Sequence, residues 1–268
     1  MRTLIKNATI VNEDKQFKGD VLIEDEFIIE VGEGIDKPAD KTIDASGKIL
    51  IPGMIDDQVH FREPGLTHKA EIKTESRAAV AGGITSYMEM PNTIPQATTI
   101  ELLEDKYKRA NEVSLANYSF YMGTTNKNLE ELLKIDQKKI CGVKIFMGSS
   151  TGDMVVNDEK ALEKTFEEVK TLIATHCEND PMIGENAKKY RAKYGENVPI
   201  ECHPDIRSRE ACYKSSSYAK SLADKYGTRL HILHISSKEE LDLFRNDIPM
   251  KQKHVTSEAC IHHMWFSR

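Results

Sequence analysis

Apolar and polar positions follow one pattern up to about residue 51 and a different pattern beyond it. Between residues 3 and 50, short apolar stretches are separated by turn-forming Gly, Asn and Asp, which is typical of β-strands. Strands are expected within residues 3–12, 19–32 and 41–53. We therefore predict a small β-domain, or part of one, in residues 1–51.

Beyond Pro52, apolar strand-like segments alternate with longer helical segments. The strands are expected at residues 51–60, 83–90, 117–123, 142–148, 171–177, 230–236 and 254–260. Helices are expected between them, within residues 69–83, 99–113, 157–170 and 208–227. This alternation predicts an α/β fold with parallel strands and right-handed crossovers, either a doubly wound sheet or a TIM-type (β/α)8 barrel.

The barrel interpretation requires an eighth strand. The seven predicted strands already extend to residue 260, so we expect the barrel in residues 52–268 to be incomplete at its C-terminal end. Residues 178–207 show the least regular pattern. We predict that they form a long connection after a strand, on the face where barrel active sites lie.

The composition is that of an ordinary soluble globular protein, with 39% hydrophobic and 30% charged residues. A net charge of −6 with interspersed signs leaves no basic surface for nucleic acid. Lys6, Asn7 and Asn12 interrupt the apolar residues at the N-terminus, which argues against a signal peptide or membrane span and favours a cytoplasmic protein. The five cysteines include no CxxC pair and are expected to be reduced.

Polar side chains gather near the predicted carboxyl ends of the strands, where barrel enzymes carry their chemistry. In "IDDQVHFREPG", residues 55–65, Gln58, His60 and Arg62 occupy every second position and share one face of a strand. Further polar residues at or near strand ends are Asn92, Lys144, His176 and His234. We expect all of these side chains to converge on one mouth of the barrel.

The histidines admit two interpretations. A single histidine on a strand is more often a hydrogen-bonded structural residue than a metal ligand, but several at equivalent strand ends favour a metal site. His231 and His234 are three positions apart and face opposite sides of a strand, so we assign the ligand role to His234. His262 and His263 follow the seventh strand and are candidates for facing the substrate.

Lys144 is the most unusual residue, because it stands between Val143 and Ile145 in an apolar strand. Burying its charge without a partner would cost several kcal/mol. An ion pair or extension of the side chain to the barrel mouth would avoid that cost. Alternatively, a lysine with a depressed pKa is neutral and can react with carbon dioxide to give a carbamate that bridges two metals.

Four segments together resemble the dihydroorotases of the amidohydrolase superfamily. They are residues 52–95, "GVKIFMGSSTG" (142–152), "THCEND" (175–180) and "LHILHIS" (230–236). The resemblance extends over essentially the whole chain. It implies a metal-dependent cyclic amide hydrolase on a (β/α)8 barrel, with a β-sandwich assembled from both chain ends and residues 1–51 as its N-terminal part.

The resemblance also implies a metal-ligand set. His60 resembles the second member of a ligand pair, Lys144 a carboxylated lysine that bridges two Zn²⁺ ions, and His176 and His234 the ligands of the second ion. Gln58 stands where the family usually has histidine, and its amide oxygen binds zinc less well than imidazole, so one or two metals are expected. The family's general-base aspartate follows strand eight, and this chain ends before it.

Arg62 and Asn92 resemble the residues that bind the substrate carboxylate. A guanidinium and an amide suit a carboxylate chemically. The implied function is reversible hydrolysis of dihydroorotate to carbamoyl-aspartate in pyrimidine biosynthesis, with a small-molecule substrate and, at the family level, a homodimer. Alternatives are a non-catalytic dihydroorotase-like scaffold, favoured by Gln58, and an allantoinase or dihydropyrimidinase, which Arg62 disfavours.

Overall fold

The computed structural model describes residues 1–150 and 152–266. These residues form two compact units, Met1–Met54 and Ile55–Arg268, which are described separately below.

The N-terminal unit is a five-stranded sheet in the order β3-β2-β1-β4, with β5 also paired to β1. Its strands are β1 (Arg2–Asn12), β2 (Lys15–Glu24), β3 (Phe27–Gly32), β4 (Lys41–Asp44) and β5 (Ile49–Leu50). β1 to β3 form an antiparallel meander, whereas β4 and β5 run parallel to β1. The segment 19–32, expected to be extended, is thus part of a hairpin that turns between β2 and β3.

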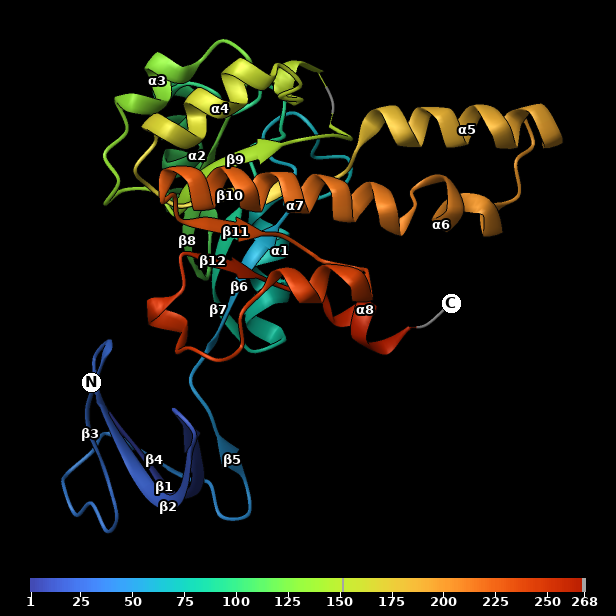
Figure 1. Cartoon of the computed structure of the whole chain (residues 1–268). Helices are drawn as coiled ribbons and strands as arrows, with labels where there is room; N and C mark the ends of the chain where they lie inside the picture. The colour runs from blue at the N-terminus through green and yellow to red at the C-terminus, as the bar shows by residue number, and fades with distance from the viewer. Residues whose placement is uncertain (151, 267–268) are drawn as a thin grey trace. The chain divides into compact units, whose positions relative to one another are not determined.

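The second unit is built on a seven-stranded parallel sheet in the order β12-β11-β10-β9-β8-β7-β6 (Figure 1). The strands are β6 (Met54–Val59), β7 (Ile84–Glu89), β8 (Asn117–Gly123), β9 (Gly142–Phe146), β10 (Ile173–His176), β11 (Leu230–Ile232) and β12 (Val255–Ser257). Each lies within a segment predicted as a strand or overlaps it closely. The predicted parallel α/β architecture is confirmed, and the sheet curls in the manner of a TIM barrel.

Four main helices lie within the stretches predicted to be helical. They are α1 (Ile72–Ala81), α2 (Ile100–Val113), α4 (Glu159–Glu168) and α7 (Arg209–Tyr226). The side chains of Thr99, Asp158 and Ser208 accept backbone N–H groups at the first turns of α2, α4 and α7. Such caps satisfy donors that the helix itself leaves unpaired.

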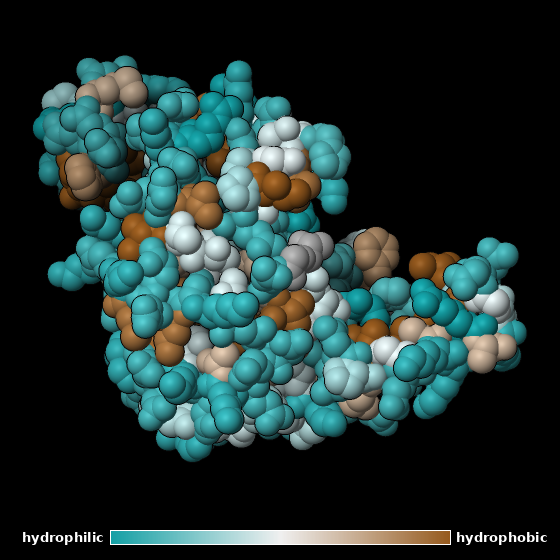
Figure 2. Space-filling view, turned by 90° about the horizontal axis from the view of Figure 1, so that it is seen from above, coloured by the Kyte–Doolittle hydropathy of each residue, from teal (hydrophilic) through white to brown (hydrophobic). Residues whose placement is uncertain are grey.

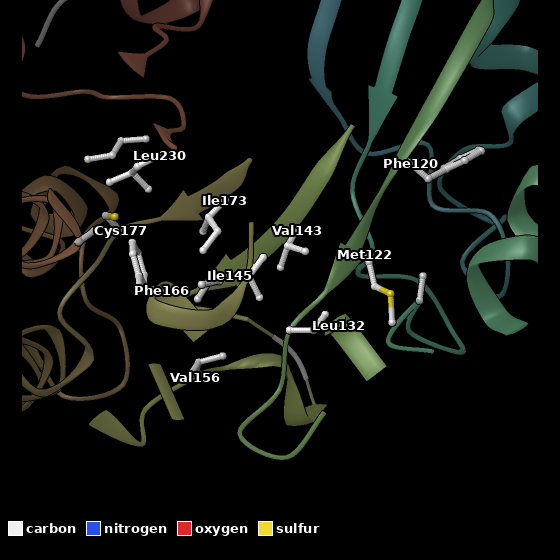
Figure 3. Close-up of a cluster of buried hydrophobic side chains, with 14 of the residues drawn as sticks. Phe120, Met122, Leu132, Val143, Ile145, Val156, Phe166, Ile173, Cys177 and Leu230 are labelled. Carbon is white, nitrogen blue, oxygen red and sulfur yellow. The ribbon is translucent and has the colours of Figure 1, made fainter. Parts of the chain in front are cut away.

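The alternation of side chains along the strands separates two apolar regions. Phe120, Val143, Ile145, Phe166 and Ile173 belong to the large buried cluster that includes residues from the helices (Figure 3). A smaller cluster contains Met90, Tyr121, Ala174 and Leu233. Since Ala174 pairs with Lys144 across β10 and β9, Lys144 shares the face of the sheet that carries this smaller cluster.

Residues 178–207 connect β10 to α7, in line with the prediction of a long connection after a strand, but the stretch is not irregular, because it contains the 15-residue helix α5 (Asp180–Tyr194). None of the side chains of α5 is buried, so no apolar stripe marks it in the sequence. Its ends do carry local signals: Asn179 accepts the N–H of Met182, Pro181 lies in the first turn, and Gly195 follows the last residue.

Shorter helical elements were not predicted. They are α3 (Leu129–Leu133), α6 (His203–Ile206), α8 (Ile261–Trp265) and 3₁₀ turns at Gly152–Met154, Ile200–Cys202, Lys238–Leu243 and Met250–Gln252. The face seen in Figure 2 is mainly hydrophilic, with apolar residues scattered among polar ones. Among the helices of the described residues, none has the length and apolar character needed to cross a membrane.

Candidate active site

Five ionisable or polar side chains project from the carboxyl-terminal ends of parallel strands. His60 follows β6, Asn92 follows β7, Lys144 lies on β9, His176 ends β10, and His234 follows β11. The positive charge of Lys144 contributes to lowering the pKa of His60, His176 and His234, so the three imidazoles lie within reach of its electric field. Residues far apart in sequence therefore meet at one end of the sheet, as expected for parallel strands.

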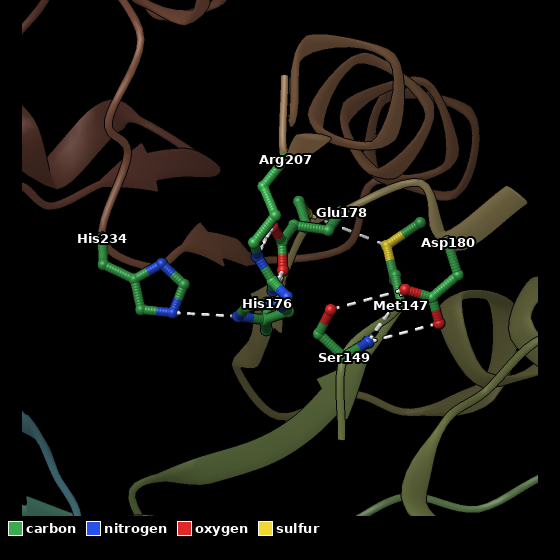
Figure 4. Close-up of polar contacts among 8 residues, drawn as sticks. Met147, Ser149, His176, Glu178, Asp180, Arg207 and His234 are labelled. Atoms are coloured by element: carbon green, nitrogen blue, oxygen red, sulfur yellow. Dashed lines mark hydrogen bonds and ion pairs between the residues drawn. The ribbon is translucent and has the colours of Figure 1, made fainter. Parts of the chain in front are cut away.

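His176 and His234 face each other directly. His176 Nδ1 lies 3.2 Å from His234 Nε2, and the two rings are edge-on with centroids 5.0 Å apart (Figure 4). Burial lowers the pKa of His176 and brings the pKa of His234 to about 3, so both rings are neutral at physiological pH. Two neutral imidazole nitrogens that point at one spot are suited to share a proton or a metal ion.

Glu178 and Arg207 fix the orientation of His176. His176 Nε2 lies 2.7 Å from Glu178 Oε2, and the Arg207 guanidinium binds both carboxylate oxygens of Glu178 (Figure 4). Burial alone would raise the pKa of Glu178, but the hydrogen bond to His176 and the charge of Arg207 lower it to about 2. An ionised Glu178 accepts the Nε2 proton, which leaves the Nδ1 lone pair of His176 directed at His234.

Lys144 is buried, and its ammonium has neither a hydrogen-bond partner nor an ion-pair partner in the described part of the chain. The exposed fraction of this residue is 1%. The ring centroid of Phe146 lies 4.5 Å from Nζ. Burial lowers the pKa of Lys144 to about 7. Neither the ion pair nor the extension to solvent occurs here, and a large fraction of this amine is neutral near pH 7.

His60 and Asn92 are joined by a hydrogen bond. His60 Nδ1 lies 2.8 Å from Asn92 Oδ1, and burial lowers the pKa of His60 to about 4. A neutral His60 that donates from Nδ1 retains its lone pair on Nε2, the state required of a metal ligand. Asn92 was expected only to bind substrate. The structure gives it a second contact, while its amide nitrogen can still act as a donor.

Arg62 lies next to this pair, and its positive charge contributes to lowering the pKa of His60. It adopts a left-handed backbone conformation with φ of 67°. None of the ion pairs within residues 1–150 and 152–266 involves its guanidinium.

Gln58 lines a pocket of about 340 Å³ together with His176, Glu178, Arg207 and His234. Cys260, His262 and His263 line the same pocket, so the two histidines predicted after the seventh strand do reach this region. His60, Arg62, Asn92 and Lys144 are not among its lining residues. The structure thus brings Gln58 beside the His176 and His234 pair, and Asn92 beside His60.

Several neighbouring residues were not identified from the sequence. Glu178 stands two positions after His176 in "THCEND", and an acidic residue just past a strand end was the available signal. Glu258 accepts the backbone N–H of His234 at 3.0 Å and lies 3.3 Å from His231 Nε2. The prediction for His231 and His234 was that they face opposite sides of a strand, but both lie against Glu258. His231 also contacts Thr256 on β12, whereas His234 faces His176.

Comparison with known proteins gives consistent matches. A family model described as "Dihydro-orotase-like" matches residues 47–240. The chain is 32% identical over 273 residues to an allantoinase of Deinococcus radiodurans, and this alignment covers 98% of the chain and 59% of the relative. It is also 32% identical over 268 residues to a dihydroorotase of Lactobacillus acidophilus, with 98% and 60% covered.

Solved structures show the same fold. An L-hydantoinase (dihydropyrimidinase) from Arthrobacter aurescens superimposes with a TM-score of 0.89 at 27% identity, covering 96% of this chain and 58% of that one. A D-hydantoinase (dihydropyrimidinase) from Thermus sp. gives a TM-score of 0.82 at 26% identity, with 97% and 58% covered. The chain therefore spans about 60% of the length of the curated relatives that it matches.

Proposed function

The chain belongs to the dihydro-orotase-like family, and from this premise we propose that its site serves a metal-dependent cyclic amide hydrolase that acts on dihydroorotate or, in reverse, on carbamoyl-aspartate. The observation that carries the choice of substrate is Arg62, a guanidinium beside His60 with no ion pair in the described residues. Both substrates carry a carboxylate, which is the natural partner of such a group. Allantoin and dihydrouracil carry none.

The residues at the strand ends fit a zinc site. The facing nitrogens of His176 and His234 supply two imidazole ligands, and His60 retains a lone pair on Nε2. Lys144, whose Nζ has no hydrogen bond in the described residues, is close enough to these three histidines to lower their pKa. A bound Zn²⁺ would supply Lewis acidity toward an amide carbonyl and toward water.

Lys144 would contribute an oxygen ligand after carboxylation. The neutral amine attacks carbon dioxide, an N–C bond forms, and one amine proton is released to solvent, which leaves an anionic carbamate. Its low pKa makes the required neutral amine available near pH 7. The modification also removes an unpaired buried ammonium, since the new anion would pair with metal.

Gln58 would make the first metal position weaker than the second. It lines the pocket beside His176 and His234 and offers an amide oxygen, a poorer zinc ligand than imidazole. The position held by Lys144, His176 and His234 has all its protein ligands. We therefore expect one tightly bound zinc and a second that is bound weakly or not at all.

Substrate orientation would rest on Arg62 and Asn92. The guanidinium can bind the substrate carboxylate in a bidentate manner, and the Asn92 amide nitrogen can donate to it while its oxygen holds His60. Orientation of this kind accelerates a reaction through proximity rather than through bond chemistry.

An allantoinase or dihydropyrimidinase is the second candidate, because an allantoinase matches this chain at the same 32% identity as a dihydroorotase. Ring opening of dihydroorotate, allantoin and dihydrouracil by the zinc-loaded protein decides between them. We expect turnover of dihydroorotate alone, lost in Arg62→Met with zinc content unchanged. Turnover of allantoin or dihydrouracil instead would refute the substrate, and a zinc-loaded protein that neither binds nor turns over any of the three would favour a non-catalytic scaffold.

A further inference from the structure

Helix α2 presents two cations to the segment that carries Arg62. Lys106 and Arg109 are three positions apart and lie on one face of the helix. Lys106 pairs with Glu89 on β7, and Arg109 Nε binds Glu63 Oε1 at 2.6 Å. Glu63 directly follows Arg62 in the chain. The proposed catalytic chemistry uses none of these four charged residues.

The Lys106 and Glu89 pair is fully buried and joins two strand ends. Exposed fractions are 2% for Lys106 and 1% for Glu89. Lys106 Nζ also donates to the carbonyl of Met90 at 2.9 Å, and the N–H of Met90 donates to the carbonyl of Val59 at 3.0 Å. The ends of β6 and β7, which lead to Arg62 and to Asn92, are thus tied to each other and to α2.

Glu89 also acts on the backbone of the Arg62 segment. Burial raises its pKa, but the Lys106 charge and the backbone N–H groups of Phe61 and Arg62 act in the opposite direction. The carboxyl group of Glu89 therefore lies against these two N–H groups as well as against Lys106. Phe61 packs against Tyr87 of β7, with ring centroids 4.5 Å apart and ring planes tilted by 46°, which adds a further contact between the two strand ends.

Glu63 provides the second anchor. Its Oε2 accepts the N–H of Ile72 at the start of α1, while its Oε1 binds Arg109 of α2. Arg62 lies between the contacts of Glu89 and those of Glu63, and its φ is 67°. This left-handed conformation costs a non-glycine residue roughly 1–3 kcal/mol and persists only where the surroundings impose it. Two charged contacts from one helix, one on each side of Arg62, supply such surroundings.

We propose that Lys106 and Arg109 of α2 are positioning residues that clamp the left-handed backbone of Arg62 through Glu89 and Glu63. For the substrate, this inference rests on the proposed function: the clamp would aim the guanidinium at the substrate carboxylate. A buried ion pair is by itself weak support for stability, because apolar residues of similar size often serve equally well. Here the buried pair of Lys106 and Glu89 lies on one side of Arg62 and the pair of Arg109 and Glu63 on the other, which gives the two pairs together a specific role.

Amide hydrogen exchange tests the clamp independently of any activity. The backbone amides around Arg62 should exchange about tenfold faster in Arg109→Gln and in Glu63→Gln, as expected for the loss of one hydrogen bond. The same increase is expected in the double variant Glu89→Met with Lys106→Met, which leaves no buried charge unpaired. Arg109→Lys should restore protection. Lys225→Gln is the matched control, since it removes a helix-borne cation paired with Glu163 of α4, far from this segment in sequence. Unchanged exchange in Arg109→Gln and Glu63→Gln would overturn the clamp.

Ligand affinity tests whether the clamp aims the Arg62 guanidinium at a carboxylate. Orotate and uracil share a ring and differ in the carboxylate, so the clamp variants should lose about tenfold in orotate affinity, the equivalent of about 1.4 kcal/mol, and little in uracil affinity. Equal losses for both ligands would indicate general loosening and overturn the positioning role. An unmodified protein that does not prefer orotate to uracil would instead refute the proposed substrate, and the exchange result would still decide whether the clamp exists.

Discussion

Replacing Lys144 by methionine should stabilise the metal-free protein at neutral pH. Lys144 and Lys106 are both buried, with exposed fractions of 1% and 2%, but only Lys106 has an ion-pair partner. Lys144 has no hydrogen-bond partner for its Nζ among the described residues. The chain therefore contains its own matched control for the cost of an unpaired buried ammonium.

The size of the effect follows from the pKa of Lys144. Burial lowers that pKa from 10.5 to about 7, and one pKa unit corresponds to about 1.4 kcal/mol, which gives a cost of up to about 5 kcal/mol. The Phe146 ring at 4.5 Å from Nζ offsets roughly 1–2 kcal/mol. We expect Lys144→Met to raise the free energy of unfolding by about 3 kcal/mol near pH 7.

The pH dependence has a defined direction. Above pH 10.5 the lysine is neutral in both the folded and the unfolded chain, and the variant should gain little. As the pH falls from 10.5 to about 7, only the unfolded chain takes up the proton, so the unmodified protein loses stability relative to the variant. Below about pH 7 both states are protonated and the difference should remain constant.

The difference in the free energy of unfolding between Lys144→Met and the wild-type protein can be measured by urea unfolding in CO₂-free buffer with chelator, from about pH 7 to above pH 10.5. Lys106→Met should behave oppositely and lose about 3–5 kcal/mol, because it leaves Glu89 buried without its partner. A Lys144→Met variant that is less stable than the unmodified protein near pH 7, or a gain that does not change with pH, would refute the assignment of an unpaired ammonium.

Three further outcomes follow from the site. Glu178→Gln should weaken zinc binding about 10–100-fold in chelator competition, because it loses the carboxylate that orients His176; unchanged affinity would contradict that role. Gln58→His should add a second tightly bound zinc in a metal titration, whereas two equally tight ions in the unmodified protein would refute the weakened first position. Cys141 is half-buried, and desolvation raises the pKa of its thiol to about 12, so it stays a thiol at about pH 8. It should resist iodoacetamide in the folded protein at that pH, while all five cysteines react after unfolding. Rapid labelling of native Cys141 would contradict the raised pKa.

The parallel sheet could be predicted because each strand is a short apolar run set off by turn residues. Lys144 stands out for the same reason, since a charge between Val143 and Ile145 breaks such a run. Helix α5 was missed because it buries no side chain and so lacks the apolar stripe on which helix prediction depends. The capping residues of α5 can be recognised in the sequence, but they indicate only where a helix could begin and end.

Pairings across the fold could not be predicted. Glu178 and Arg207 are 29 residues apart, on either side of the segment that contains α5, and no periodicity relates them. In the sequence, Lys106 looks like a solvent-exposed lysine on an amphipathic helix. Only the structure shows that it pairs with Glu89 of β7. The second contact of Asn92 likewise depends on how the ends of β6 and β7 meet, which brings its amide oxygen within 2.8 Å of His60.

The zinc content of the purified protein tests the central claim, that the strand ends form a metal centre, most directly. The protein is first exposed to zinc and bicarbonate, and loosely bound metal is then removed. We expect about one zinc per chain in the wild-type protein and in Arg62→Met, but almost none in His234→Ala or Lys144→Met. Retention of zinc by both His234→Ala and Lys144→Met, or an unmodified protein that binds none, would contradict the account.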